Sequence, residues 1–206
     1  MRKLMFLVIL GFAVTIIWHG VDAIPVMANV ERSQAKATFA GGCFWCMEEV
    51  FEGLEGVVSV ISGYTGGEMA NPTYEQVSAG GTGHAEAIEV LYDSDKVTYQ
   101  QLLTVFWRNV DPTTPNAQFC DHGNQYRSAI FYHDEKQKEA VETSLQTVNR
   151  TKAFPQTIVT EIVPASAFYP AEEYHQDFYT KNSVRYKYYK WNCGRAKRLE
   201  QLWGKP

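Results

Sequence analysis

The chain has no excess of positive charge. Its 206 residues include 19 Lys and Arg against 23 Asp and Glu, and the net charge is −4. Proteins that bind nucleic acid usually gather Lys and Arg into a basic patch, so nucleic acid is not an expected partner. The sequence also lacks any repeat with a period of about 20 to 50 residues, which excludes a solenoid. A hydrophobic fraction of 45% instead predicts one globular domain with a sizeable core, expected to be a monomer.

Long apolar runs are scarce. The main one, residues 4–18, follows two basic residues and is shorter than the roughly 20 residues of a membrane-spanning helix. Small residues at 21–23 then offer a cleavage site, which is the arrangement of an export signal, with an uncleaved membrane anchor as the alternative. We therefore expect a periplasmic or secreted protein, divided into an export signal peptide, a linker and one catalytic domain at residues 1–23, 24–36 and 37–206.

Cysteine is also rare, with four residues at positions 43, 46, 120 and 193. An exported protein can form disulfides, but a domain of this length does not need them as its main source of stability. The sequence has no second Cys-x-x-Cys and no His pair near the first, so we predict no metal site. The cysteines are therefore expected to do chemistry.

Hydrophobic periodicity predicts the order of the secondary structure. Thr98 with Gln101 has the pattern of a capping box, and Asp134 is expected to begin another helix. Residues 65–83 and 111–124 are predicted to be long loops. The resulting order predicts an α/β (α+β) two-layer domain with helices packed on a mixed sheet. The predicted strands are 36–40, 57–64, 85–92, 128–132 and 157–163, and the predicted helices are 43–56, 98–110, 134–149 and 170–181.

The segment GGCFWC, residues 41–46, places Cys43 at the predicted start of a helix. Free backbone N–H groups there stabilise an anion, and the thiolate is the nucleophilic form of cysteine. Gly41 and Gly42 are expected to let another molecule approach the backbone closely. A small buried helix residue is the alternative interpretation of Cys43.

Cys46 lies three positions after Cys43, on the same helical face. The Cβ atoms of such a pair are about 5–6 Å apart, which exceeds the spacing of a relaxed disulfide. A bridge between them would distort the first turn and would suit a transient, catalytic disulfide. Phe44 and Trp45 between them are predicted to wall an apolar or sulfur-bearing substrate group, although core packing of both is an alternative.

Glu86 is the second informative residue. Alternation along residues 84–92 places it on the apolar face of a strand with Ile88 and Val90. Burial there raises the pKa of a carboxyl group and favours a proton donor. A carboxylate that reaches water at the strand end is the alternative. For Tyr74, Asp121 and Tyr126, the pattern alone does not separate a site from a surface loop.

Six ordered motifs together resemble the A-type peptide methionine sulfoxide reductases, over residues 37–182. They are GGCFWC, GYTGG, NPTYEQV, TGHAEA, DPTTPN and NQYRSAIFY. The resemblance implies the role of each matching residue. Cys43 would be the nucleophile, Phe44 and Trp45 would contact the substrate methyl group, and Glu86 would donate a proton to the sulfoxide oxygen. Tyr74 and Tyr126 would hydrogen-bond that oxygen, and Asp121 matches an active-site aspartate.

The same resemblance implies a sandwich built around a split β-α-β, ferredoxin-like core. It also implies repair of oxidised methionine, as the S epimer, in proteins and as the free amino acid. The nucleophile would become a sulfenic acid, then a disulfide. An external dithiol of the thioredoxin type would reduce that disulfide, with no resident cofactor.

The resolving thiol remains open at this point. The C-terminal segment WNCGRAKRLEQLWGKP departs from the glycine-rich tail with resolving cysteines that is one common pattern of the family. Cys46 is favoured over Cys193, and Cys193 over Cys120. A general thiol–disulfide oxidoreductase and a secreted binding domain with structural disulfides are the competing interpretations.

Overall fold

The computed structural model describes residues 33–205, and the predicted signal peptide lies outside them. The first strand begins at Gln34, so the last three residues of the predicted linker belong to the sheet. Six strands form this sheet, in the order β7-β6-β1-β3-β2-β8, and every neighbouring pair is antiparallel except β6 with β7. The strands are β1 (Gln34–Gly41), β2 (Val57–Thr65), β3 (Ala85–Asp93), β6 (Ser128–Tyr132), β7 (Glu161–Pro164) and β8 (Tyr169–Pro170).

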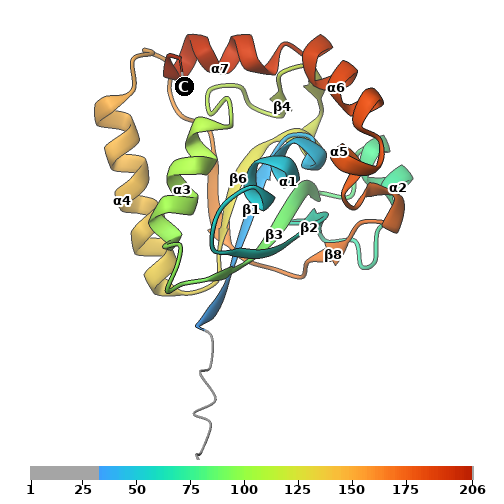
Figure 1. Ribbon diagram of the computed structural model, residues 1–206, viewed down its shortest axis with the longest axis horizontal. Helices are drawn as coiled ribbons and strands as arrows, with labels where there is room; N and C mark the ends of the chain where they lie inside the picture. The colour runs from blue at the N-terminus through green and yellow to red at the C-terminus, as the bar shows by residue number, and fades with distance from the viewer. Residues whose placement is uncertain (1–32, 206) are drawn as a thin grey trace, which may run out of the picture. The chain divides into compact units, whose positions relative to one another are not determined.

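Seven α-helices are described within residues 33–205, and a small hairpin completes the fold (Figure 1). The hairpin pairs β4 (Ala117–Gln118) with β5 (Asp121–His122). Two short 3₁₀ turns cover Asn124–Tyr126 and Glu173–His175. The helices are α1 (Phe44–Glu52), α2 (Tyr74–Ala79), α3 (Tyr99–Arg108), α4 (Glu135–Thr151), α5 (Phe178–Lys181), α6 (Ser183–Asn192) and α7 (Arg195–Trp203).

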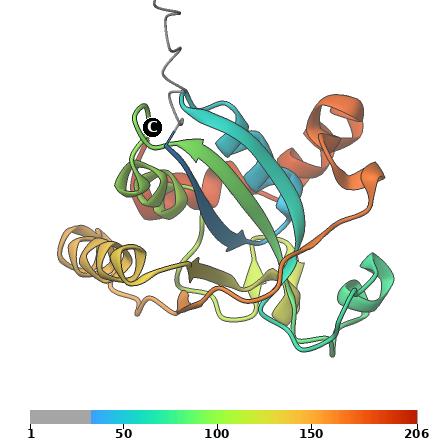
Figure 2. The same cartoon turned by 90° about the horizontal axis from the view of Figure 1, so that it is seen from below.

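The main core lies between one face of the sheet and helices α1 and α3. Alternate residues of β1 and β3 point into it, as their two-residue period requires, and they meet the apolar stripes of the two helices. The opposite face carries small residues such as Ala40, Ala87 and Ala129 and is covered by the segment around Phe168. Figure 2 shows this segment crossing the sheet on the side away from α1. The predicted mixed α+β class is therefore confirmed, and the structure adds that the sheet is mostly antiparallel.

Local sequence signals explain where most helices begin. The Thr98 hydroxyl accepts from the Gln101 N–H, and the Gln101 side chain accepts from the Thr98 N–H, so the predicted capping box is present. Asp134 accepts from the Gln137 N–H at 2.8 Å and caps α4. An identical box of Thr73 and Gln76 begins α2, so the prediction of a structureless loop over 65–83 was wrong.

The predicted helix at 170–181 was also wrong. Tyr169 and Pro170 pair with β2 as a short strand. The Gln176 side chain then accepts from the Ser62 N–H and donates to the Ser62 carbonyl, which ties the next segment to the sheet. Asp177 has a left-handed φ of 54° and interrupts any continuous helix. Long-range hydrogen bonds therefore override the local helical pattern, and only α5 remains.

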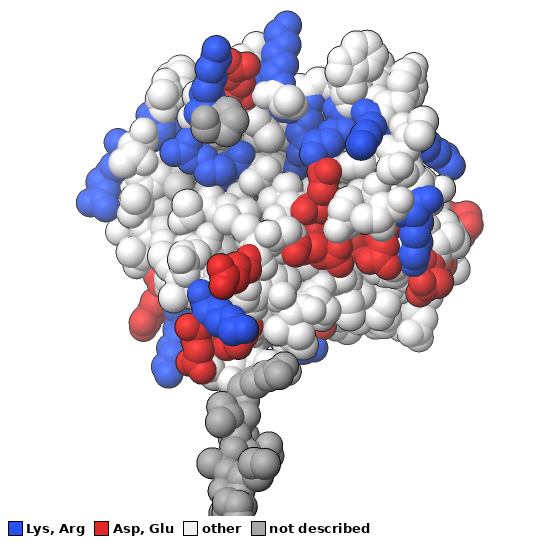
Figure 3. Space-filling model, in the orientation of Figure 1, with Lys and Arg blue, Asp and Glu red and all other residues white. Residues whose placement is uncertain are grey.

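The surface carries both signs of charge. Figure 3 shows Lys and Arg gathered over the edge where α6 and α7 lie, with Asp and Glu in a band beside them. Among residues 33–205, no helix has the length and hydropathy needed to span a membrane.

Candidate active site

Cys43 is the residue that caps α1, immediately before the helix begins. Its ψ of 118° is outside the helical range, so Cys43 lies at the N-cap position and Cys46 at the third position of the helix. An N-cap side chain normally turns toward that third residue. The two thiols are close enough for each to shift the pKa of the other. Because the backbone of Cys43 is outside the helical range, the spacing expected of two residues inside a helix does not apply to this pair.

The two glycines before Cys43 serve packing rather than an approach to the backbone. A Cβ atom at Gly41 would lie 2.6 Å from the Met47 sulfur, and one at Gly42 would lie 2.5 Å from the Gln118 Cβ. The backbone of Gly42 also has a φ of 81°, which residues other than glycine rarely adopt. The prediction that these glycines leave room for another molecule is wrong, because the protein itself fills that room.

A small cavity of about 80 Å³ lies at the N-terminus of α1. The fold brings together Cys43 and the six residues that were predicted to act with it as catalytic or substrate-contacting groups. Their assigned roles remain predictions. The lining residues are Cys43, Phe44, Trp45, Tyr74, Glu86, Asp121 and Tyr126, together with Tyr189 from α6.

Glu86 lies on β3 with its side chain directed toward the start of α1. It is 3% exposed, as the alternation of β3 predicts. One carboxyl oxygen accepts from the Phe44 N–H at 3.1 Å. Burial raises the pKa of Glu86 to about 8, and the nearby Asp121 adds to the shift against the hydrogen bond from Phe44. Glu86 is therefore mostly protonated at neutral pH and able to donate a proton into the cavity.

The two thiols share one proton near neutral pH. Burial raises the pKa of Cys43 well above its usual value, and the neighbouring Cys46 adds to this effect. A hydrogen bond from Cys43 lowers the pKa of Cys46 to about 6, and Arg195 contributes in the same direction. The expectation that the helix N-terminus lowers the pKa of Cys43 is therefore corrected. The pair carries the negative charge, and its proton rests mainly on Cys43.

Phe44 and Trp45 form one side of the cavity and are held from behind. The Trp45 ring stacks on Phe178 with centroids 3.7 Å apart, and its Nε1–H donates to His175 Nδ1 at 3.2 Å. The Phe44 ring lies 5.0 Å from the His175 ring and 5.9 Å from Tyr64. The two interpretations of this pair therefore combine, because each ring packs on the core with one side and lines the cavity with the other.

Tyr74 and Tyr126 come from two short helical elements far apart in the chain. Tyr74 opens α2, where its N–H donates to Glu172 at 2.8 Å, and its ring lies 4.4 Å from His175. Tyr126 ends the short 3₁₀ turn that follows β5. Burial raises the pKa of both phenols, and Glu86 adds to this shift once it is ionised, so both remain protonated. Two hydroxyl donors therefore line the same cavity as the thiol and Glu86.

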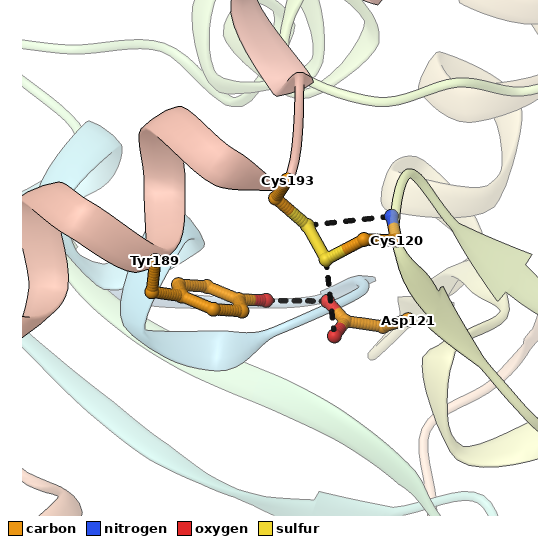
Figure 4. Close-up of a disulfide and its surroundings, with 4 residues drawn as sticks. All are labelled: Cys120, Asp121, Tyr189 and Cys193. Atoms are coloured by element: carbon orange, nitrogen blue, oxygen red, sulfur yellow. Dashed lines mark hydrogen bonds between the residues drawn. A yellow bond between two sulfur atoms is a disulfide. The ribbon is translucent and has the colours of Figure 1, made fainter.

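Asp121 lines the cavity, and the other two cysteines lie beside it, bonded to each other (Figure 4). Cys120, in the turn between β4 and β5, is bonded to Cys193, which follows α6. The Tyr189 hydroxyl, one turn before Cys193, donates to Asp121 at 2.5 Å. Burial raises the pKa of Asp121, and the bond from Tyr189 opposes this shift.

Tyr189 is the lining residue that sequence reasoning missed. The segment YKYYKW at residues 186–191 holds four aromatic residues, and its pattern does not say which ring reaches the cavity. His175 and Phe178, which hold Trp45, were also missed, because the predicted helix over 170–181 gave no indication of their approach to α1.

Two groups of side chains among residues 33–205 are close enough together to be considered as metal ligands. In the first, Cys120 and Cys193 are bonded to each other beside Asp121, which removes both thiolate ligands. In the second, burial raises the pKa of Glu48 to about 7, so its carboxyl group is partly protonated at neutral pH. This set also includes Glu52 and Asp177.

A buried thiol pair beside a protonated carboxyl group and two phenols defines a thiol-dependent oxidoreductase. Comparison with known proteins identifies which one. Residues 35–206 match the family model described as peptide methionine sulfoxide reductase. The chain therefore belongs to this family, as the motifs predicted, and it is an oxidoreductase that reduces methionine sulfoxide.

Individual relatives agree with the family model. The chain is 49% identical over 173 residues to a peptide methionine sulfoxide reductase MsrA of Listeria monocytogenes serotype 4b, covering 84% of this chain and 98% of that protein. It is 49% identical over 176 residues to MsrA/MsrB of Vibrio cholerae, covering 85% of this chain but 47% of that protein. The crystal structure of reduced Mxr1 from Saccharomyces cerevisiae is 34% identical, with a TM-score of 0.67 over 73% of this chain and 86% of that one.

Proposed function

We propose that this chain reduces the S epimer of methionine sulfoxide, in proteins and as the free amino acid, with Cys43 as the nucleophile. The observation that carries this proposal is the cavity itself. The cavity has a volume of about 80 Å³, and a thiol, a protonated carboxyl group and two phenol donors line it. This is the set of groups that a sulfoxide needs, because its sulfur becomes electrophilic only as its oxygen gains a proton.

The reduction proceeds in one balanced step. The proton shared by the thiol pair moves to Cys46, which leaves the thiolate on Cys43. This thiolate attacks the sulfoxide sulfur while Glu86 gives its proton to the oxygen and the hydroxyls of Tyr74 and Tyr126 donate to it. The oxygen transfers to the Cys43 sulfur, so that methionine leaves and Cys43 becomes a sulfenic acid. The rings of Phe44 and Trp45 receive the substrate methyl group.

Cys46 resolves the sulfenic acid. It is a free thiol hydrogen-bonded to Cys43, whereas Cys193 is bonded to Cys120. Attack of Cys46 on Cys43 forms a disulfide and releases the oxygen as water. An external dithiol of the thioredoxin type returns the enzyme to the reduced state, so that the catalytic cycle needs no resident cofactor.

The fold and the setting of the enzyme complete the proposal. β1 and β2 are joined by α1 and separated by β3, and β6 pairs with β1 on its other side. This order supports a split β-α-β unit of the ferredoxin-like type.

We further infer that residues 1–23 direct export to the periplasm or the exterior, with an uncleaved membrane anchor as the alternative, and that the domain at 37–206 acts as a monomer.

The experiment that tests this function measures turnover of the two separated epimers of a methionine sulfoxide peptide with dithiothreitol. We expect reduction of the S epimer alone. Equal rates on both epimers would refute the proposed specificity for the S epimer. Reduction of insulin disulfides with no methionine formed would instead favour the general thiol–disulfide oxidoreductase.

A further inference from the structure

The outer face of α6 is apolar, although it faces solvent. Among residues 33–205, the three most exposed large apolar side chains are Val184, Trp191 and Tyr188, at 83%, 77% and 68%. All three belong to α6, at positions i, i+7 and i+4, so they lie on one face of the helix. The rings of Tyr188 and Trp191 are 6.4 Å apart. We call these three residues the α6 stripe, and a contiguous exposed stripe of this kind marks an interaction site.

The inner face of α6 is already packed on the domain. Tyr186 is 1% exposed, and its hydroxyl donates to Glu49 at 2.6 Å. The Tyr189 hydroxyl donates to Asp121 beside the cavity. At 100° per residue, Tyr186 and Tyr189 leave the helix on the side away from the α6 stripe. A surface helix that is packed through one face normally carries polar residues on the other, so the α6 stripe is not explained by the fold or by the cavity.

The surroundings of the α6 stripe are basic. Residues 178–203 contain seven Lys and Arg residues and one Glu, in a chain whose net charge is −4. Figure 3 shows these cations gathered over the edge where α6 and α7 lie. Arg185 and Lys187 flank the stripe on α6, and Lys197 is exposed on α7. Within residues 33–205, no carboxylate lies within 4.0 Å of any of these three cations, so their charges are available to an anionic partner.

We propose that the α6 stripe docks this domain on an anionic lipid surface. Trp and Tyr rings favour the boundary between headgroups and acyl chains, and a helix with an apolar face flanked by Lys and Arg lies in the plane of that boundary. Tyr188 and Trp191 would enter the boundary, while Arg185 and Lys187 would meet the phosphates. This inference goes beyond the proposed function and does not depend on it.

The size of the α6 stripe favours a lipid surface over a protein partner. A stable protein interface needs a matched surface of about 800 Å² on each partner, and three side chains on one short helix do not provide it. A bilayer requires no matching side chains, only an apolar face and complementary charge. Because Tyr189 leaves α6 on the other side, the proposed contact uses no residue of the cavity.

The test measures binding of residues 24–206 to lipid vesicles. Residues 31–206 form one compact unit by themselves, and leaving out residues 1–23 removes an apolar run that would itself bind lipid. The protein is mixed with vesicles of phosphatidylglycerol and phosphatidylcholine, or of phosphatidylcholine alone, and the fraction that sediments is measured. We expect binding to the anionic vesicles, little binding to the neutral ones, and a loss of binding at high salt, because salt screens exposed charges.

Substitutions in the α6 stripe separate its contribution from that of net charge. Tyr188→Ser and Trp191→Ser should each weaken binding about tenfold, because each removes a large side chain from the apolar boundary. Lys187→Gln should weaken it about fivefold. Two matched controls lie on other surfaces: Val58→Ser removes a side chain that is 48% exposed on β2, and Lys136→Gln removes an exposed cation from α4. Neither control should change binding, and all five variants should keep the native urea midpoint.

Three outcomes would overturn the proposal. The first is a native protein that does not sediment with anionic vesicles. The second is a loss of binding in the controls equal to that in the α6 variants, because attraction would then depend on overall charge or apolar surface. The third is Trp191→Ser that binds vesicles normally but turns over with dithiothreitol and not with thioredoxin. In that case the α6 stripe receives the protein reductant rather than a lipid surface.

Discussion

Replacing Glu86 with Gln removes the proton donor while keeping its shape. The amide oxygen of the introduced side chain would still accept from the Phe44 N–H, as the Glu86 carboxyl group does at 3.1 Å, but the amide has no proton to give to the sulfoxide. General acid catalysis contributes about 10²–10⁴-fold, so we expect the methionine-forming step at pH 7 to slow by that factor. This corresponds to roughly 3–5 kcal/mol of barrier.

The pH dependence of the native protein follows from the same group. With a pKa of about 8, about 90% of Glu86 is protonated at pH 7, and the rate of methionine formation should fall as the pH rises through 8. On the acid side, the thiol pair loses its charge below about pH 6. We expect a bell-shaped profile, from which Glu86→Gln removes the alkaline limb. The rate of Glu86→Gln should be closer to the native rate in acid, where hydronium ions replace the missing proton donor.

The same substitution should stabilise the fold at neutral pH. Glu86 is 3% exposed, and its pKa is raised from 4.5 to about 8. The folded chain holds this proton more tightly than the unfolded chain, so stability falls as the pH rises from about 4.5 to about 8. At pH 7 this costs on the order of 3 kcal/mol, which Gln avoids.

Two assays check these expectations. Stopped-flow formation of methionine in a single turnover measures the rate, and urea unfolding at pH 5 and pH 7 measures the stability. A Glu86→Gln protein with near-native rate at pH 7 would refute the role of proton donor. The unfolding free energy of Glu86→Gln should exceed that of the native protein by more at pH 7 than at pH 5. If this difference does not grow between the two pH values, the burial argument is refuted, even if activity is lost.

Three further substitutions test other parts of the site. Cys43→Ser should form no methionine with dithiothreitol, and substantial turnover would exclude it as the nucleophile. Tyr189→Phe removes a bond to Asp121 and a contact that lowers the pKa of Cys43, so the Cys43 thiolate forms less readily and methionine formation should slow about tenfold; a native rate would count against this contact. Gly42→Ala should lower the unfolding free energy by about 2–4 kcal/mol, because its Cβ would lie 2.5 Å from buried Gln118; an unchanged urea midpoint would contradict the packing argument.

Local pattern predicted those parts of the molecule that local physics governs. The capping residues Thr98 and Asp134 begin their helices as expected, since a cap involves only the next three residues. The two-residue alternation of β3 correctly predicted that Glu86 is buried, because every second side chain of a strand points to the same face of the sheet. The helix position next to two glycines likewise drew attention to Cys43.

The residues around the cavity that come from distant segments were predicted only through family motifs. Tyr74, Asp121 and Tyr126 lie in elements of two to six residues, which are too short for a periodicity that ties a side chain to the core. Their approach to Cys43 depends on how β4, β5 and α2 sit on the sheet, and this depends on contacts between segments far apart in the chain.

What the sequence determined by itself was the family, the order of most strands and helices, and the chemistry of Cys43 and Glu86. The tertiary structure alone decided that Cys120 bonds Cys193 across a separation of 73 residues and that Tyr189 reaches the cavity. It also decided that residues 170–177 follow the sheet, because the Gln176 side chain bonds Ser62 more than 100 residues earlier. Spacing along the chain carries no information about such pairs, since only the packed fold brings their atoms together.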